Sequence, residues 1–69
     1  MFTLRVYKAK SGKPVTEKRV TVSGRYKAAG QTDDFGEVHF DLEPGDYSIR
    51  VGDRDIETVY IEGRHFVYL

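Results

Sequence analysis

The residues best suited to chemistry are acidic side chains in and around the predicted turns of the second half of the chain. Ca²⁺ is a hard cation that takes about six to eight oxygen ligands, so these acids suggest a calcium site in a loop. However, no stretch has the ligand spacing of an EF-hand loop, and acids in turns accept hydrogen bonds from backbone N–H groups without any metal. We therefore expect turn chemistry and neither a metal nor a cofactor, with a loop calcium site as the alternative. The acids are Asp33, Asp34, Asp41, Glu43, Asp46, Asp53 and Asp55.

Two histidines, His39 and His65, fall on different predicted strands of a chain that contains no Cys. We expect solvated or hydrogen-bonded side chains, with a two-ligand zinc site at an interface as the alternative. Neither histidine has the sequence context of a Ser/His/Asp or Cys/His nucleophile system. A chain of 69 residues also has little room for both a core and a water-excluding pocket. We therefore predict that the protein is not an enzyme and has no catalytic residue.

Short runs in which apolar and polar residues alternate predict β-strands with one buried face. In the middle of the chain, for example, Val38, Phe40 and Leu42 are apolar and the residues between them are polar. No segment has helical spacing with helix caps, so we expect a single all-β domain, residues 1–69, with almost no helix. The predicted strands cover residues 2–7, 19–23, 26–28, 37–42, 47–51, 56–61 and 65–69.

Turn residues separate these strands. Asp33 supplies a side-chain acceptor for backbone N–H groups, and Gly36 can adopt a positive φ angle. Pro44 and Gly45 predict a second turn, after which the alternation resumes at Tyr47. We interpret this central stretch as turn, strand, turn, strand, which describes a meander. Further turns are predicted at residues 8–14, 52–55 and 62–64.

The charges are balanced overall but are unevenly distributed along the chain. Residues 1–30 contain eight Lys and Arg against Glu17 alone, whereas residues 31–69 contain ten acids against three Arg. We expect cross-strand pairing between the two halves, with a dipolar docking surface as the alternative. A net charge of zero and the lack of an aromatic stacking motif argue against nucleic acid as a partner.

The small size of the chain limits its stability. A core of this size is expected to yield only about 3–5 kcal/mol, and without Cys no disulfide can add to it. Good packing, an oligomer or a larger assembly would supply the rest. No apolar run reaches transmembrane length, so we expect no membrane insertion. Since there is no signal segment, we expect a cytoplasmic location if the chain is complete, and an extracellular or surface location if it is excised from a larger protein.

Outward aromatic residues are the most informative surface feature. By alternation, Tyr7, Tyr26, Tyr60 and Tyr68 point away from the core. The last predicted strand, residues 65–69, is apolar on both of its faces, so the face with Phe66 and Tyr68 is exposed if the other serves the core. Exposed apolar area marks an interface. We therefore predict contact with a protein partner or self-association through Tyr7, Tyr60, Phe66 and Tyr68, with carbohydrate binding at the outward tyrosines as the alternative.

The order of the motifs resembles a known family. Gly30-Gln31-Thr32-Asp33-Asp34-Phe35-Gly36 precedes Leu42-Glu43-Pro44-Gly45-Asp46-Tyr47, and this combination resembles the carboxypeptidase regulatory-like domains. These are transthyretin-like (prealbumin-like) modules, related in outline to the B-type repeats of bacterial collagen adhesins. The resemblance covers residues 4–61 and implies a seven-stranded, two-sheet Greek-key β-sandwich, transthyretin-like or Ig-like, used as a spacer, adhesive or docking module. It also implies that Tyr47 forms a tyrosine corner.

Two chemistries known in relatives of this family are not expected here. Adhesin repeats often carry an internal isopeptide bond between a first-strand Lys, for which Lys8 would stand in, and an Asn or Asp of the last strand. The chain has no Asn, and residues 63–69 contain no Asp. Transthyretin-like hydroxyisourate hydrolases use a His/Arg set and end in Tyr-Arg-Gly-Ser, whereas this chain ends in Phe66-Val67-Tyr68-Leu69.

Overall fold

The structure, a computed structural model, describes residues 1–69 and is all-β, with seven strands and no helix. The strands are β1 (Phe2–Tyr7), β2 (Arg19–Gly24), β3 (Lys27–Gln31), β4 (Glu37–Phe40), β5 (Gly45–Val51), β6 (Arg54–Ile61) and β7 (Gly63–Tyr68). The all-β prediction is therefore confirmed.

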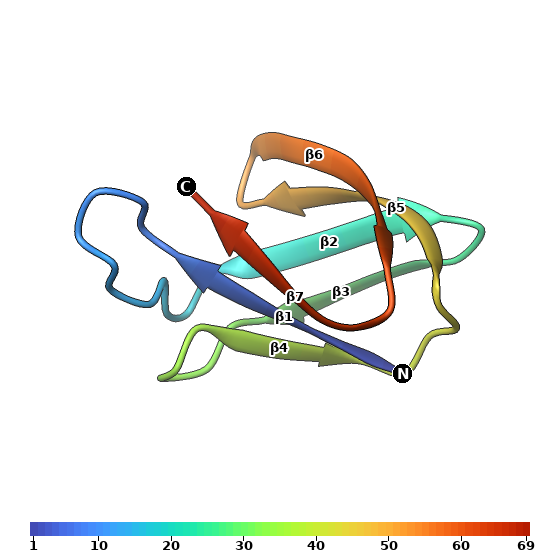
Figure 1. The fold of residues 1–69 in the computed structure, drawn as a ribbon, viewed down its shortest axis with the longest axis horizontal. Helices are drawn as coiled ribbons and strands as arrows, with labels where there is room; N and C mark the ends of the chain where they lie inside the picture. The colour runs from blue at the N-terminus through green and yellow to red at the C-terminus, as the bar shows by residue number, and fades with distance from the viewer.

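The strands form two sheets that face each other (Figure 1). One is three-stranded, in the order β4-β1-β7, and the other is four-stranded, in the order β3-β2-β5-β6. β1 and β7 are parallel, and every other pair is antiparallel. The connections β1–β2, β3–β4, β4–β5 and β6–β7 cross from one sheet to the other. The first and last strands of the chain thus lie side by side.

The core lies between the two sheets and follows the predicted alternation. In β1, Phe2, Leu4 and Val6 are buried, while the residues between them are half-buried on the other face. Burying a side chain of this size stabilises the fold by about 1.5–3 kcal/mol. Thirteen residues form one cluster: Phe2, Leu4, Val6, Val15, Val20, Val22, Val38, Phe40, Tyr47, Ile49, Val51, Ile61 and Val67.

The predicted meander is wrong, because β4 and β5 belong to different sheets. β4 pairs with β1, with Phe40 opposite Phe2, whereas β5 pairs with β2 and β6. The connection between them, residues 41–44, therefore passes from one sheet to the other instead of making a hairpin. Alternation marks which face of a strand is buried but not which sheet the strand joins, since both sheets bury one face in the same core.

Several strand boundaries also differ from the prediction. Gly45 is not a turn residue but the first residue of β5, because it pairs with Ile61 of β6. Arg54 lies in a predicted turn but is the first residue of β6, opposite Val51. Leu42 lies beyond the end of β4 and packs against the core as a partly buried residue. β3 runs from residue 27 to residue 31, whereas the predicted strand covers residues 26–28. In each case the strand begins or ends where its pairing with a neighbouring strand begins or ends, and the local sequence does not specify that pairing.

The turn before β4 contains the side-chain acceptor that the sequence predicts. Asp33 Oδ1 accepts hydrogen bonds from the backbone N–H groups of Phe35 and Glu37, both at 2.9 Å. Gly36 has a φ of 77° and lies against β1, where Val6 N donates to Gly36 O at 2.8 Å. A Cβ at this position would come within 2.6 Å of Val6 O. Gly36 is therefore required both by its backbone angle and by the closeness of β1.

Tyr47 makes the contact expected of a tyrosine corner. Its hydroxyl donates to Glu43 O at 2.7 Å, which ties β5 to the end of the connection from β4. Its ring is buried and lies 5.2 Å from the ring of Phe2, measured between centroids. The corner thus links a turn to the aromatic part of the core, at the point where the chain passes between sheets.

We predict that Gly36→Ala lowers the free energy of unfolding more than Gly52→Ala does. Both glycines have a positive φ, but a Cβ at Gly52 meets nothing within 4 Å. Gly52→Ala is expected to cost about 1 kcal/mol, from backbone strain alone. Gly36→Ala is expected to cost at least about 2 kcal/mol, because the strand contact must also open. Urea denaturation of the two variants measures the difference, and equal losses would contradict the close approach of the turn to β1.

Candidate functional site

The outer face of the three-stranded sheet carries three aromatic rings, here called the aromatic cluster: Tyr7, Phe66 and Tyr68. The parallel register places Tyr7 of β1 opposite Tyr68 of β7. The ring centroids of Tyr7 and Tyr68 are 5.9 Å apart with 24° between the planes, a stacked arrangement, and those of Tyr7 and Phe66 are 6.2 Å apart. The two β7 rings remain exposed, Phe66 at 46% and Tyr68 at 61%.

The sequence of β7 forces this exposure. Val67 is completely buried in the core, so its two neighbours must point to the opposite face. β1 has the same constraint, because Val6 is completely buried and Tyr7 therefore lies outward, half-buried beside the rings of β7. The core and the aromatic cluster are thus two faces of the same pair of strands.

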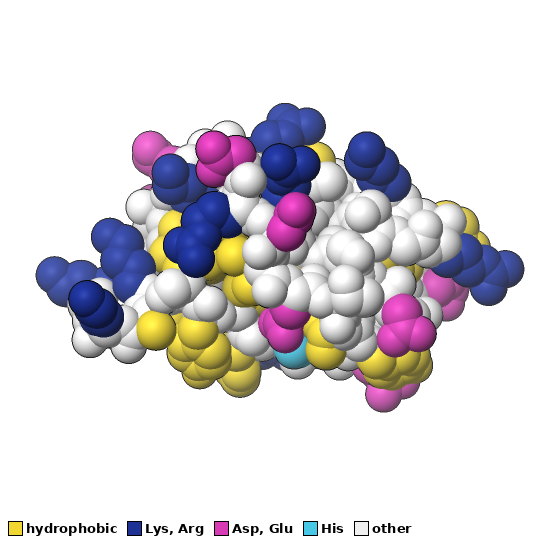
Figure 2. All heavy atoms as spheres, turned by 90° about the horizontal axis from the view of Figure 1, so that it is seen from above, with side chains coloured by type: hydrophobic (Ala, Val, Ile, Leu, Met, Phe, Trp, Pro, Cys, Tyr) yellow, Lys and Arg dark blue, Asp and Glu magenta, His cyan; other side chains and the backbone are white.

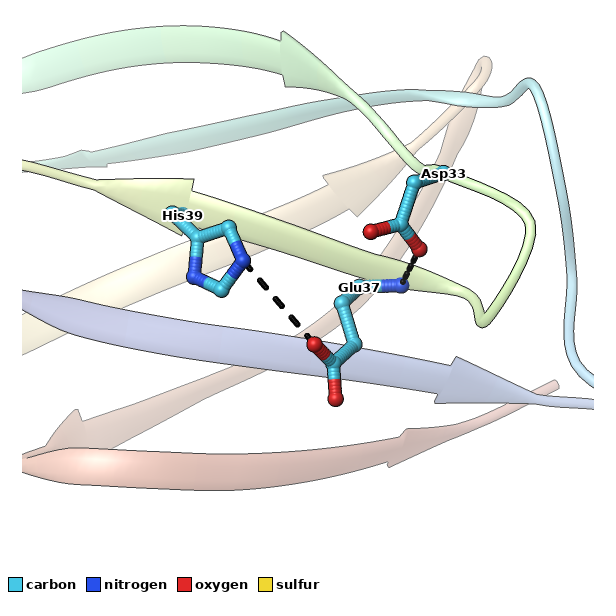
Figure 3. Close-up of side chains that lie close together, drawn as sticks. All are labelled: Asp33, Glu37 and His39. Atoms are coloured by element: carbon cyan, nitrogen blue, oxygen red, sulfur yellow. Dashed lines mark hydrogen bonds and ion pairs between the residues drawn. The ribbon is translucent and has the colours of Figure 1, made fainter.

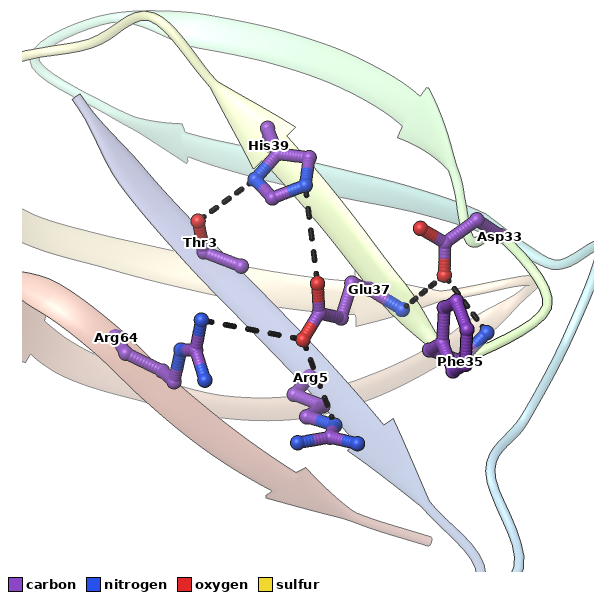
Figure 4. Close-up of polar contacts among 7 residues, drawn as sticks. All are labelled: Thr3, Arg5, Asp33, Phe35, Glu37, His39 and Arg64. Carbon is purple, nitrogen blue, oxygen red and sulfur yellow. Dashed lines mark hydrogen bonds and ion pairs between the residues drawn. The ribbon is translucent and has the colours of Figure 1, made fainter.

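A group of polar side chains lies beside the aromatic cluster on the same face; it is called the polar cluster and comprises Thr3, Arg5, Glu37, His39 and Arg64 (Figure 4). Glu37 is at its centre: its carboxylate lies 3.6 Å from Arg5 Nε, 4.0 Å from an Arg64 guanidinium nitrogen and 3.9 Å from His39 Nε2. The guanidinium carbon of Arg5 lies 5.3 Å from the centroid of the Tyr7 ring. Arg5 therefore joins the two clusters through an ion pair on one side and a cation–π contact on the other.

Asp33, Glu37 and His39 together resemble a metal site, since their ligand atoms lie within 4.8 Å of one another (Figure 3). Asp33 Oδ1, however, is already the acceptor of two backbone hydrogen bonds. The carboxylate of Glu37 lies beside the guanidinium groups of Arg5 and Arg64, which compete with any cation for its charge. The residues therefore serve the turn and the ion pairs, and none of the other six candidate acids joins them.

Both histidines are hydrogen-bonded, but their contacts are of different kinds. The ring of His39, on the outer face, lies with Nδ1 2.8 Å from Thr3 Oγ1. His65 is half-buried, with Nε2 3.0 Å from Glu57 Oε2. This second contact links β7 of one sheet to β6 of the other. Neither histidine lies beside a nucleophilic Ser or with the other histidine in a common cluster.

Tyr60 does not join the other predicted contact residues. It lies on β6 of the four-stranded sheet, opposite Asp46, and is exposed on the face of that sheet that points away from the core. The four residues predicted for contact therefore divide into three that lie together and one on the opposite side of the molecule. Sequence alternation showed that Tyr60 points outward but not from which sheet.

The outer face of the four-stranded sheet has a different character from the aromatic face. Arg19, Lys27 and Arg50 surround a shallow hollow of about 370 Å³ with a floor of small residues such as Thr21 and Ala29. Seen from above, Lys and Arg side chains gather along the upper edge of the molecule, and hydrophobic ones along the lower edge (Figure 2). Two other hollows, of about 400 and 260 Å³, lie elsewhere, and none of the three includes a histidine.

Charge pairing between the two halves of the chain is limited. Arg5–Glu37 joins the basic first half to the acidic second half, but Arg50–Asp55 and Arg64–Glu37 have both partners in the second half. The expected cross-strand pairing is thus present at one position only. The polar cluster itself was missed by sequence reasoning. The sequence does indicate that Arg5 and Glu37 point outward, but only the register of β1 with β4 places them opposite each other.

The pKa of Asp33 is held below its ordinary value of 3.8, chiefly by the hydrogen bond from the N–H of Glu37 and then by that from Phe35. A lowered pKa in the folded state means that ionised Asp33 stabilises the fold above its ordinary pKa, and that this contribution is lost as the pH falls through the lowered value. We predict that, as the pH is lowered from about 4 to about 2, the free energy of unfolding falls less in Asp33→Asn than in the wild type. Urea denaturation across this range measures it.

Asp34→Asn is the matched control, because the neighbouring Asp34 side chain makes no hydrogen bond or ion pair in the structure. This variant is expected to keep the acid-side slope of the wild type. The prediction would be contradicted if the pH dependence of the unfolding free energy stayed at the wild-type value in Asp33→Asn but became weaker in Asp34→Asn.

No family model matches the chain, and no curated protein matches it either. The structure has no helix that is long and apolar enough to cross a membrane.

Proposed function

We propose that this chain is a non-enzymatic module that contacts another protein through the aromatic cluster and acts in docking or spacing within a larger assembly or homo-oligomer. The observation that carries the proposal is the stack of Tyr7, Phe66 and Tyr68, in which two rings stay about half exposed to solvent. Contiguous exposed apolar area with a polar rim is typical of a protein interface. Tyr and Arg are also enriched in interfaces.

The rings are prepared for contact by their surroundings. Tyr7 lies beside both β7 rings, and Arg5 lies over Tyr7 and is paired with Glu37. Aromatic side chains held in this way lose little conformational entropy when a partner covers them. Arg64 and His39 lie at the margin of the same face and provide hydrogen-bond donors for the rim.

We also propose that the two sheets form a Greek-key β-sandwich of the transthyretin-like kind, related to carboxypeptidase regulatory-like domains. Support comes from the seven strands in two sheets, the Asp33–Gly36 turn and the contact of the Tyr47 hydroxyl with Glu43. Modules with this architecture bind through their faces and edges, so the fold agrees with a docking role but does not by itself specify one. The sugar-binding alternative is less well supported, because Tyr60 and Tyr7 lie on opposite sides of the molecule.

We predict that Phe66→Ser combined with Tyr68→Ser abolishes association of this protein at high concentration. The double change removes both exposed rings and leaves the buried Val67 in place. Light scattering is expected to show an apparent mass that rises with concentration toward the millimolar range for the wild type but not for the double variant. Circular dichroism verifies that the variant is folded.

Tyr60→Ser is the matched control, since it removes an equally exposed tyrosine from the other sheet. It is expected to associate as the wild type does. A wild type that is strictly monomeric at every concentration, and indistinguishable from the double variant, would rule out contact through the aromatic cluster.

A further inference from the structure

β7 is an edge of the three-stranded sheet, because it pairs with β1 alone. Just beyond it, Leu69 N donates to Tyr7 O at 2.8 Å and Ala9 N donates to Leu69 O at 2.9 Å. Both backbone groups of Leu69 therefore point toward β1. Backbone groups of successive strand residues point to alternate sides, so the odd-numbered residues of β7 face β1. The residues whose N–H and C=O groups face the open edge are Arg64, Phe66 and Tyr68.

This edge lacks most of the features by which sheets prevent further pairing. β4 has only four residues, β3 carries Lys27, and the pairing of β6 with β5 contains a bulge. β7 has six residues in regular register with β1, with neither Pro nor Lys. Its polar inward side chain, His65, lies within hydrogen-bond distance of Glu57 of β6. Of the four edges, β7 is therefore the one best suited to accept another strand.

The three-stranded sheet is also one strand narrower than the sheet that it faces. β3 and β4 contact each other on one side of the molecule, whereas β6 extends beyond β7 on the other (Figure 1). Ile56 and Val59 of β6 are consequently only half-buried although they pack against the core. One more strand beside β7 would lie over β6 and cover these two side chains.

β6 restricts the kind of strand that can pair with β7. A two-sheet partner that offered its own edge strand would bring its second sheet into the space that β6 occupies. Glu62 alone joins β6 to β7, so an added strand can enter only from the Leu69 end and must end or turn away near Arg64. An extended peptide segment that covers only residues 64–68 satisfies both restrictions.

We propose that the partner is a lone extended segment of another protein that pairs antiparallel with β7; this rests on the proposed function and names its kind of partner. Antiparallel pairing is the more stable of the two directions per residue. The first residue of the segment then lies opposite Tyr68, the third opposite Phe66 and the fifth opposite Arg64. Each of these pairs exchanges two backbone hydrogen bonds, which supply affinity as in other strand additions to a sheet edge.

The outer face of β7 specifies the odd-numbered residues of the segment. Side chains directly opposite each other on one face of a sheet are in contact, so the exposed rings of Phe66 and Tyr68 favour aromatic or β-branched residues at the third and first positions. Arg64 shares the carboxylate of Glu37 with Arg5, which leaves an excess of positive charge. This charge favours Asp or Glu at the fifth position.

The inner face specifies the two remaining residues. The second residue of the segment lies beside Val67 and the fourth beside His65, and both point toward β6. Ile56 and Val59 favour a β-branched apolar residue at the second position. The contact between His65 and Glu57 favours a small polar residue at the fourth, because an apolar one would leave these groups less well satisfied. The segment Tyr-Val-Tyr-Thr-Glu meets all of these requirements.

A synthetic peptide of this sequence, preceded by two Lys for solubility, tests the pairing. The amides of His65 and Val67 face β1 and are expected to be protected from hydrogen exchange without the peptide. The amides of Arg64, Phe66 and Tyr68 are expected to exchange freely in the protein alone and to become protected when the peptide binds. NMR measures exchange residue by residue, and a bound peptide that leaves these three amides unprotected would overturn the proposal.

Methylation of single peptide nitrogens separates backbone pairing from side-chain contact. In the proposed register the N–H of the third peptide residue bonds to Phe66, whereas the N–H of the second faces away from β7. Methylation of the third nitrogen is expected to weaken binding at least about tenfold, and methylation of the second, the matched control, less than about twofold. Equal effects of the two methyl groups would show that the peptide is not held as a strand.

A charge exchange tests the register. Arg64→Glu is expected to weaken binding of the peptide about threefold, and a peptide with Lys at the fifth position is expected to bind this variant better than it binds the wild type. Arg25→Glu is the control, since it makes the same charge change at an exposed residue outside the three-stranded sheet. An equal loss in both variants would mean that Arg64 does not lie opposite the fifth residue.

Weak affinity of the free peptide is overcome by joining the same five residues to Leu69 through about six Gly and Ser residues, which gives an effective concentration in the millimolar range. Protection of the three edge amides is expected in this fusion. If neither the peptide nor the fusion protects them while the wild type associates, strand pairing is wrong and the proposed function stands. If the Phe66→Ser, Tyr68→Ser double variant binds the peptide as tightly as the wild type does, strand pairing stands and the role proposed for the aromatic cluster fails.

Discussion

Parallel pairing between β1 and β7 is the interaction on which the rest of this structure depends. It joins the first strand of the chain to the last, so the chain between them must form the other five strands and come back to β1. Closing so long a loop carries an entropic cost that only a buried contact offsets. Here that contact is made by Leu4, Val6 and Val67, which are completely buried. A change in the β1–β7 register by one residue would reverse both faces of β7 at once.

The same pairing produces the proposed contact surface. Because strand residues alternate, burying Val67 exposes Phe66 and Tyr68, and the parallel register brings both rings to Tyr7. In a small domain without disulfides, covering such a surface in an assembly is also a source of stability beyond that of the core.

The groups that look most reactive in the sequence are used for structure. Asp33 holds the turn before β4, and Glu37 lies between two guanidinium groups and a histidine. His65 bridges the two sheets through Glu57. On the outer face of the three-stranded sheet, Arg5, Arg64 and His39 thus share the carboxylate of Glu37, while the rings of Phe66 and Tyr68 beside them stay exposed. Surface ion pairs of this kind contribute only about 0–1 kcal/mol each, and their main effect here is to orient Arg5 and Arg64 beside the rings.

By itself the sequence determined the strands, their buried faces and the chemistry of the turns. The alternation of Phe2, Leu4 and Val6, the acceptor at Asp33 and the hydroxyl of Tyr47 all act through local backbone geometry, and the structure contains each of them. Only the tertiary structure decided that β4 and β5 join different sheets, that Tyr60 lies away from Tyr7 and that Glu37 meets Arg5 and Arg64. The physical reason is that a period of two distinguishes the two faces of a strand but contains no information on its neighbours. Neighbours are chosen by burial over the whole core, which places β7 at an open edge with its aromatic side chains outward.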